Sequence, residues 1–257
     1  MKKVWITSLV RKEEQVGNML GLAKKYGLDA NGHFWVDDLK HMAWLAPKES
    51  CLDPEMGLWV IMGSAKDMEG ASIRYGLGLL ALTVQAKRGN GFPILWVSTE
   101  GEIKAEALPT PLRGAEVVAL SSAVLGAKLV AKANTPVPKM DMDYRLDIHA
   151  NPGFGVWMEI GPGKGHQWNG ALFGVHGADI DAHGVGNAGK LPEKSVVEYP
   201  MKGLKLNLGE RDYTAWAVQN KLDENLSYYV RVKDAPASML FGPYAQDEEA
   251  EAHVIEF

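Results

Sequence analysis

The chain has 257 residues, 46% of them hydrophobic, and a formal net charge of −5 at pH 7. That length predicts one large domain or two of ordinary size, and the negative charge argues against a general nucleic-acid binder. Cys51 is the single cysteine, which excludes a disulfide within the chain and suits a reducing cytoplasm. The first apolar run is too short for a secretory signal, and no window of 18 apolar residues predicts a membrane span.

The first half of the chain alternates short apolar runs with amphipathic helical patterns. Such runs are typical of strands buried on both faces of a parallel sheet. In the longest helical pattern, Ile73, Leu77, Leu80 and Val84 recur on one face. Five strands alternating with helices predict a doubly wound, flavodoxin-like parallel sheet. The expected strands are 3–9, 33–36, 58–62, 92–97 and 115–120, and the expected helices are 13–26, 41–45, the segment around 73–84, and 123–133.

The pattern changes after residue 134. The segment 135–140 contains two prolines within three residues and predicts a linker. We therefore expect an α/β domain over 1–134 and a second domain over 141–257. The charge divides in the same way, since residues 1–140 carry 17 Lys and Arg against 14 Asp and Glu, whereas the rest carries 10 against 18.

The second domain shows short alternating or aromatic runs separated by glycine, proline, Asp or Asn turns. Runs of this kind predict an antiparallel β-sandwich. One of them lies at 195–199, and a last strand is expected at 253–257 after an acidic, solvated segment at 247–250. Most of the aromatic side chains in these runs are expected in the sandwich core, namely those of Trp157, Trp168, Phe173, Trp216, Tyr228, Tyr229 and Phe241.

Three motifs in roughly the first 120 residues resemble those of Toll/interleukin-1-receptor (TIR) domains. KVWITS resembles the family's first strand, often DVFISY, and PILWV resembles a later strand, often PILPV. VIMGSAKDMEGASIRYGLGLLAL resembles the third strand, the loop serine (here Ser64) and the helix start. The resemblance implies a flavodoxin-like fold. It also implies loss of the usual NAD cleavage, because Gly76 stands where NAD-cleaving members carry a helical glutamate. A protein of this kind would bind a nucleotide or another protein.

Topology predicts a ligand site independently of that resemblance. Ligands of open α/β sheets bind outside the carboxyl ends of the strands. The Gly63–Lys66 loop at this edge offers backbone N–H groups and a cation to a phosphate, although it matches neither the P-loop nor the dinucleotide fingerprint. The alternative is an ordinary solvated rim. The candidate ligand-binding residues are Ser8, Arg11, Asp37, Gly63, Ser64, Lys66 and Ser98.

A second candidate site lies in the sandwich. Asp179, Asp181 and His183 alternate, so a regular strand would place all three side chains on one face, with His176 just before them. Carboxylates and imidazoles are ligands of Zn²⁺, Mn²⁺ or Fe²⁺. The alternative is an ordinary outward face of an acidic domain.

The leading interpretation is a non-catalytic, cytoplasmic interaction or nucleotide-sensing protein with a protein partner or a second copy of itself. The alternative is a hydrolase that acts on a nucleotide or NAD through Glu69 or Asp67, or a metal-dependent hydrolase at the histidine and aspartate cluster. A third class is a carbohydrate-binding or surface-binding sandwich, which requires exposed aromatic side chains.

Overall fold

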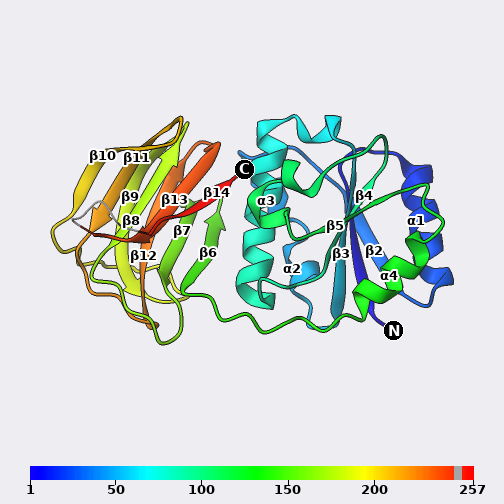
Figure 1. Cartoon of the computed structure of the whole chain (residues 1–257), viewed down its shortest axis with the longest axis horizontal. Coiled ribbons are helices and arrows are strands. Elements are labelled where there is room, and N and C mark those ends of the chain that lie inside the picture. The colour runs from blue at the N-terminus through cyan, green and yellow to red at the C-terminus, as the bar shows by residue number, and fades with distance from the viewer. Residues whose placement is uncertain (246–250) are drawn as a thin grey trace. The chain divides into compact units, whose positions relative to one another are not determined.

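The structure is a computed structural model that describes residues 1–245 and 251–257. The chain forms two compact units, Met1–Met140 and Asp141–Phe257 (Figure 1). The first is an α/β domain and the second is all-β, which confirms the predicted fold class. The segment 247–250, expected to be acidic and solvated, lies outside the described residues. None of the described helices combines the length and the apolar character needed to cross a lipid bilayer.

The first domain is built on a five-stranded parallel sheet with the order β2-β1-β3-β4-β5, which is the flavodoxin-like order. In Figure 1, α1 and α4 lie on one face of this sheet and α3 on the other. The strands are β1 (Lys3–Ser8), β2 (Asp29–Phe34), β3 (Met56–Gly63), β4 (Ile94–Ser98) and β5 (Glu116–Ala119). The α-helices are α1 (Glu13–Lys25), α2 (Lys48–Leu52), α3 (Ala71–Arg88) and α4 (Leu125–Ala133).

Four single turns of 3₁₀ helix complete the first domain: Ala43–Leu45, Lys66–Met68, Ala105–Ala107 and Thr110–Leu112. The first of these turns, Ala43–Leu45, forms where a helix was expected over 41–45. Its preceding residue, Met42, has a φ of 54°, a left-handed conformation that cannot continue a right-handed helix.

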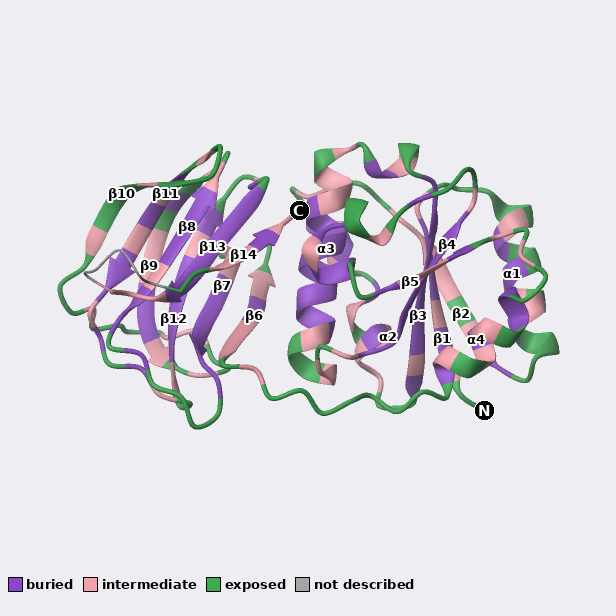
Figure 2. Cartoon of the chain, viewed as in Figure 1, coloured by how far each residue is buried: buried purple, intermediate pink, exposed green. Residues whose placement is uncertain are grey.

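The central strand β3 is buried almost throughout because helices cover both faces of the sheet (Figure 2). Leu58 and Val60 belong to a core cluster with Met19 of α1 and Leu129 of α4. The intervening Trp59 points to the other face, where its indole N–H donates to the Thr7 hydroxyl at 2.9 Å. The continuous apolar run is therefore explained by burial on both faces.

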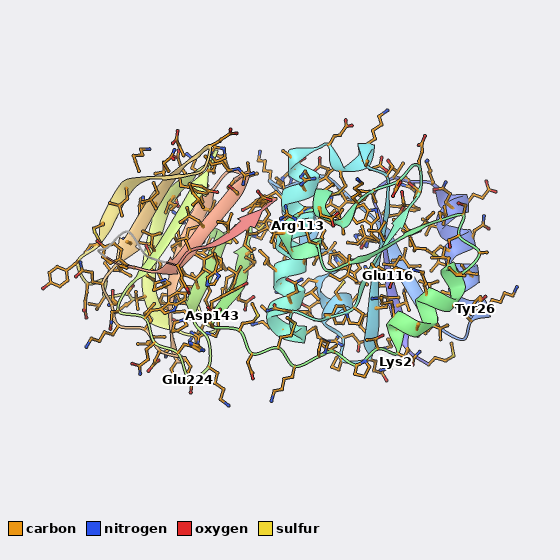
Figure 3. All side chains as sticks on the ribbon, viewed as in Figure 1. Lys2, Tyr26, Arg113, Glu116, Asp143 and Glu224 are labelled. Atoms are coloured by element: carbon orange, nitrogen blue, oxygen red, sulfur yellow. The ribbon has the colours of Figure 1, made fainter. Side chains whose placement is uncertain are left out.

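The glycine at position 76 of α3 allows close packing against aromatic rings. A Cβ at that position would lie 2.9 Å from the ring of Trp35 and 3.4 Å from the Cβ of Trp44. A side chain at position 76 would thus crowd the Trp35 ring, whatever the relation of Gly76 to a catalytic position in other proteins. On the opposite face of the sheet, Glu116 of β5 pairs with Lys128 and Lys132 of α4 and so ties this helix to the edge strand. Figure 3 labels Glu116.

The second domain is a sandwich of two antiparallel sheets. One has the order β10-β11-β8-β13-β14 and the other has the order β6-β7-β12-β9. The strands are β6 (Tyr144–Asn151), β7 (Gly155–Pro162), β8 (Ala171–His176), β9 (Asp179–Asn187), β10 (Met201–Leu208), β11 (Arg211–Val218), β12 (Leu226–Lys233), β13 (Ser238–Pro243) and β14 (His253–Glu256).

The segment 195–199, expected as a strand, is not one. Ser195 instead lies against the backbone of Gly184, and its hydroxyl accepts a hydrogen bond from the Val185 amide at 2.6 Å. Pro192 packs on Gly186 in the same way. The connection between β9 and β10 therefore folds back onto β9.

Candidate functional site

The serine hydroxyls at the carboxyl edge of the parallel sheet bond within their own loops. Ser8 donates to the carbonyl of Val10 at 2.8 Å, and Ser98 donates to the carbonyl of Gly101 at 2.7 Å. All the serines expected at this edge, Ser8, Ser64 and Ser98, are buried. Their hydroxyls thus stabilise the loop conformations.

The Gly63–Lys66 loop is organised around Asp67. Both the backbone N–H and the hydroxyl of Ser64 donate to one carboxylate oxygen of Asp67, at 2.7 and 2.8 Å. The carbonyl of Gly63 accepts from the Trp96 indole at 3.2 Å. Asp67, one of the two expected catalytic carboxylates, therefore occupies one of the loop N–H groups that were expected to bind a phosphate.

The charged residues expected at the same edge bond separately from one another. Arg11 pairs with Glu13 on the surface, and Asp37 accepts from the Ser72 hydroxyl at 2.6 Å. Lys66 and Glu69 are exposed.

The structure does not bring the expected metal ligands of the sandwich together. His183 bonds through Nδ1 to the Tyr228 hydroxyl at 2.8 Å, whereas His176 bonds to the carbonyl of Asp212 at 2.8 Å. Asp181 forms an ion pair with Arg231, and Asp179 is exposed at the start of β9.

An irregularity in β9 separates Asp181 from His183. Along the β9–β12 pairing, Ala182 lies opposite Arg231 and Ile180 lies opposite Val232, so Asp181 has no partner position. An extra residue of this kind is a β-bulge, and it reverses the alternation of side chains beyond it. His183 consequently turns toward Tyr228 and the core, where burial lowers its pKa to about 4, with a further contribution from Lys202.

The structure instead gathers polar side chains on the outer face of the four-stranded sheet. In the β6–β7 hairpin, Asp147 lies opposite Glu159 and His149 lies opposite Trp157. Positions two apart share a face, so these four side chains lie on one side, away from the buried Met158. On β12, Tyr229 lies opposite Glu159 and Arg231 lies opposite Trp157, so the row of side chains continues across the sheet. We call this set of side chains the polar face; it consists of Asp147, His149, Trp157, Glu159, Tyr229 and Arg231.

At one end of the polar face, Glu159 accepts the hydrogen bonds of its neighbours, and it is only 3% exposed. One carboxylate oxygen accepts from the Gly189 amide and the Ser227 hydroxyl, each at 2.7 Å, and the other contacts Nε2 of His149 at 2.6 Å. Burial raises the pKa of Glu159, but the hydrogen bonds from His149, Gly189 and Ser227 outweigh it and hold the pKa below its usual value. The group is therefore an ionised, buried carboxylate.

A pocket of about 370 Å³ lies at the other end of the polar face. Arg231 donates from Nε and from a terminal nitrogen to the two carboxylate oxygens of Asp181, at 2.7 and 3.3 Å. Trp157 supports the guanidinium, 5.5 Å from its ring centre, and donates its indole N–H to the carbonyl of Phe154 at 3.0 Å. The pocket is lined by Gly153, Phe154, Gly155, Asp181, Arg231, Val232 and Lys233.

Comparisons with known proteins give matches among solved structures alone. No protein-family model matches the chain, and no curated protein matches its sequence. One similar solved structure is that of a two-domain esterase active on acetylated mannans, co-crystallised with mannopentaose. Its TM-score is 0.31 and its sequence identity is 9%, and the match covers 99% of this chain and 90% of that one. A second structure of such an esterase gives a TM-score of 0.29 and 9% identity over 99% of this chain and 91% of that one.

The leading interpretation drawn from the sequence, a non-catalytic interaction or nucleotide-sensing protein, is corrected by this finding: the similar solved structures are those of esterases active on acetylated mannans. The geometry gives a physical reason as well: at the expected nucleotide edge the Ser64 amide is bound to Asp67.

Proposed function

We propose that the sandwich domain binds carbohydrate in the pocket between Phe154 and Lys233. The observation that carries the proposal is the Asp181–Arg231 pair beside an exposed aromatic ring, since the Phe154 side chain is 45% exposed. Sugars present hydroxyl groups, which both donate and accept hydrogen bonds, and C–H faces that pack on apolar surfaces. A carboxylate accepts, a guanidinium donates, and an aromatic ring supplies the apolar contact.

The polar groups of the pocket are held in place before any ligand arrives. The guanidinium of Arg231 is fixed on one side by two bonds to Asp181 and on another by the Trp157 ring. A Cβ at position 155 would lie 3.3 Å from Cδ of Arg231, so Gly155 lets the turn lie close against that side chain. Such preorganisation lowers the ordering cost of binding.

The charge of the lining indicates which sugars to test. Arg231 and Lys233 face one carboxylate, that of Asp181, which leaves one excess positive charge. Acidic sugars such as uronates therefore fit the pocket better than neutral hexoses, and the volume lies in the range of about 300–1,000 Å³ usual for small-ligand sites.

Isothermal titration calorimetry with oligosaccharides of uronic acids and of neutral hexoses tests this function. We expect saturable binding by the full chain, and a loss of at least tenfold in affinity for Phe154→Ala and for Arg231→Gln. Tyr199→Ala removes an aromatic side chain that is 74% exposed and outside the pocket lining, and we expect it to bind as the native chain does. Equal binding by all four proteins, or no binding to either sugar class, would refute the proposal.

A further inference from the structure

We propose that Asp147, His149 and Glu159 bind one divalent transition-metal ion, for which Zn²⁺ is the best-fitting probe. Within residues 1–245 and 251–257, these are the side chains of metal-ligating type that converge as a group of three. Their donor atoms, one carboxylate oxygen from each acid and a ring nitrogen of His149, all lie within 4.8 Å of one another. The site is independent of the carbohydrate pocket.

The hairpin holds the three donors in a rigid arrangement. Asp147 and Glu159 are directly opposite on β6 and β7, and His149 follows Asp147 by two positions on the same face. A zinc ion lies ~2.0–2.2 Å from nitrogen and oxygen ligands, so binding needs side-chain shifts of only about an ångström. Sites carried on regular strands keep their geometry better than sites carried on loops.

The carboxylate of Glu159 is oriented as ligand carboxylates are in metal proteins. The Gly189 amide and the Ser227 hydroxyl hold one of its oxygens and direct the other toward His149. Arg145 in turn donates to the Ser227 hydroxyl at 3.0 Å and to the carbonyl of Glu224, which lies in the turn before β12. Outer hydrogen bonds of this kind orient metal ligands and tune their affinity.

Charge favours a cation at the same point. Asp147 and Glu159 lie directly opposite one another on β6 and β7, and they are 9% and 3% exposed. A divalent cation placed between two such carboxylates would be attracted to both. A metal ion would replace the hydrogen bond between His149 and Glu159 and would bind both of these side chains at once.

The donor set selects the kind of ion. One imidazole and two carboxylates suit zinc and manganese, whereas Ca²⁺ and Mg²⁺ prefer oxygen donors throughout. Three protein donors also leave a coordination position for water. We therefore expect Zn²⁺ to bind much more tightly than Ca²⁺ or Mg²⁺.

The test is titration of the full chain, freed of metal with EDTA, with ZnCl₂ in a calorimeter. We expect one ion per chain, and a fall in affinity of at least tenfold for His149→Gln and for Asp147→Asn. His176→Gln is the matched control because His176 is also half-buried on a strand but bonds to a backbone carbonyl. It should bind zinc as the native chain does.

Circular dichroism in EDTA shows whether each variant is folded. Co²⁺ added to the native chain gives a second readout that needs no variant: bound Co²⁺ should develop visible d–d absorption that Zn²⁺ abolishes. The proposal is overturned if the native chain shows no saturable site, if folded His149→Gln binds zinc unchanged, or if Ca²⁺ binds as tightly as Zn²⁺.

Discussion

The carboxyl edge of the parallel sheet and the polar face of the sandwich both gather polar side chains but use them differently. At the edge, Ser8 and Ser64 bond to groups two and three positions away in the chain. On the polar face, Glu159 bonds to groups 10, 30 and 68 positions away. The first set closes loops, whereas the second set joins β6, β7, β12 and the segment after β9.

The hydroxyls of Ser8 and Ser64 therefore stabilise loops, whereas the bonds of Glu159 join separate strands. A side-chain bond to a near neighbour satisfies backbone groups that a loop would otherwise leave unpaired. Distant bonds form only when the whole sheet is in register, and they fix side-chain orientation as a binding site requires. The polar face therefore carries both proposed sites.

The largest expected effect on stability is at Glu159. Glu159→Gln removes the charge from a buried carboxylate with three hydrogen-bond donors, and we expect a loss of about 2–3 kcal/mol in the free energy of unfolding. Asp67→Asn makes the same change at the sheet edge and should cost under about 1 kcal/mol. Urea unfolding in EDTA measures both, and equal losses would break the distinction between the two regions.

A smaller effect is expected where α3 packs on aromatic rings. Gly76→Ala gains helix propensity but pushes a Cβ against the Trp35 ring, 2.9 Å away. Gly17→Ala in α1 is the matched control, because an added Cβ there meets nothing within 4 Å. Overpacking costs ~1–3 kcal/mol and Gly to Ala in a helix gains up to ~1 kcal/mol, so Gly17→Ala should stabilise the chain and Gly76→Ala should not. The thermal unfolding midpoints of the two variants and the native chain measure this difference. Equal stabilisation by Gly17→Ala and Gly76→Ala would show that Trp35 moves aside freely.

The pH dependence of stability is expected to involve one histidine in each domain. Burial lowers the pKa of His33 to about 4, and burial with Lys202 nearby does the same for His183. An unfolded histidine has a pKa of about 6.5, so the unfolded chain binds these protons more tightly. The stability that depends on the neutral rings is present above pH ~6.5 and is lost as the pH falls from there through ~4.

Urea unfolding of the native chain, His33→Gln and His183→Gln at about pH 7.5 and about pH 5 tests that dependence. Each variant should lose less stability on acidification than the native chain does. An identical loss in native and variant chains would assign the acid sensitivity to other groups.

Several expectations drawn from the sequence stay predictions: the TIR resemblance, a protein partner or second copy, and a cytoplasmic location. The close contact between Gly76 and Trp35 bears on the TIR resemblance. A glycine that packs closely against an aromatic ring gives no information on whether a catalytic glutamate was ever lost at that position.

The architecture was predictable from the sequence because apolar periodicity is a property of neighbouring residues. The run at Leu58–Met62 predicted a strand buried on both faces, and β3 is such a strand. The positions of Asp181 and Glu159 were not predictable in the same way. Strict alternation predicted that Asp181 and His183 share one face of the strand. A β-bulge instead places them on opposite faces, and Asp181 forms an ion pair with Arg231.

Glu159 lies in a strand predicted correctly, yet its partners depend on tertiary structure. Asp147 and His149 reach it only through the register of the β6–β7 hairpin, and Gly189 reaches it only because the connection after β9 folds back. Local patterns determine which segments become strands, because neighbouring residues carry the periodicity. Strand register and loop path decide which side chains meet, because those contacts join residues far apart in the chain.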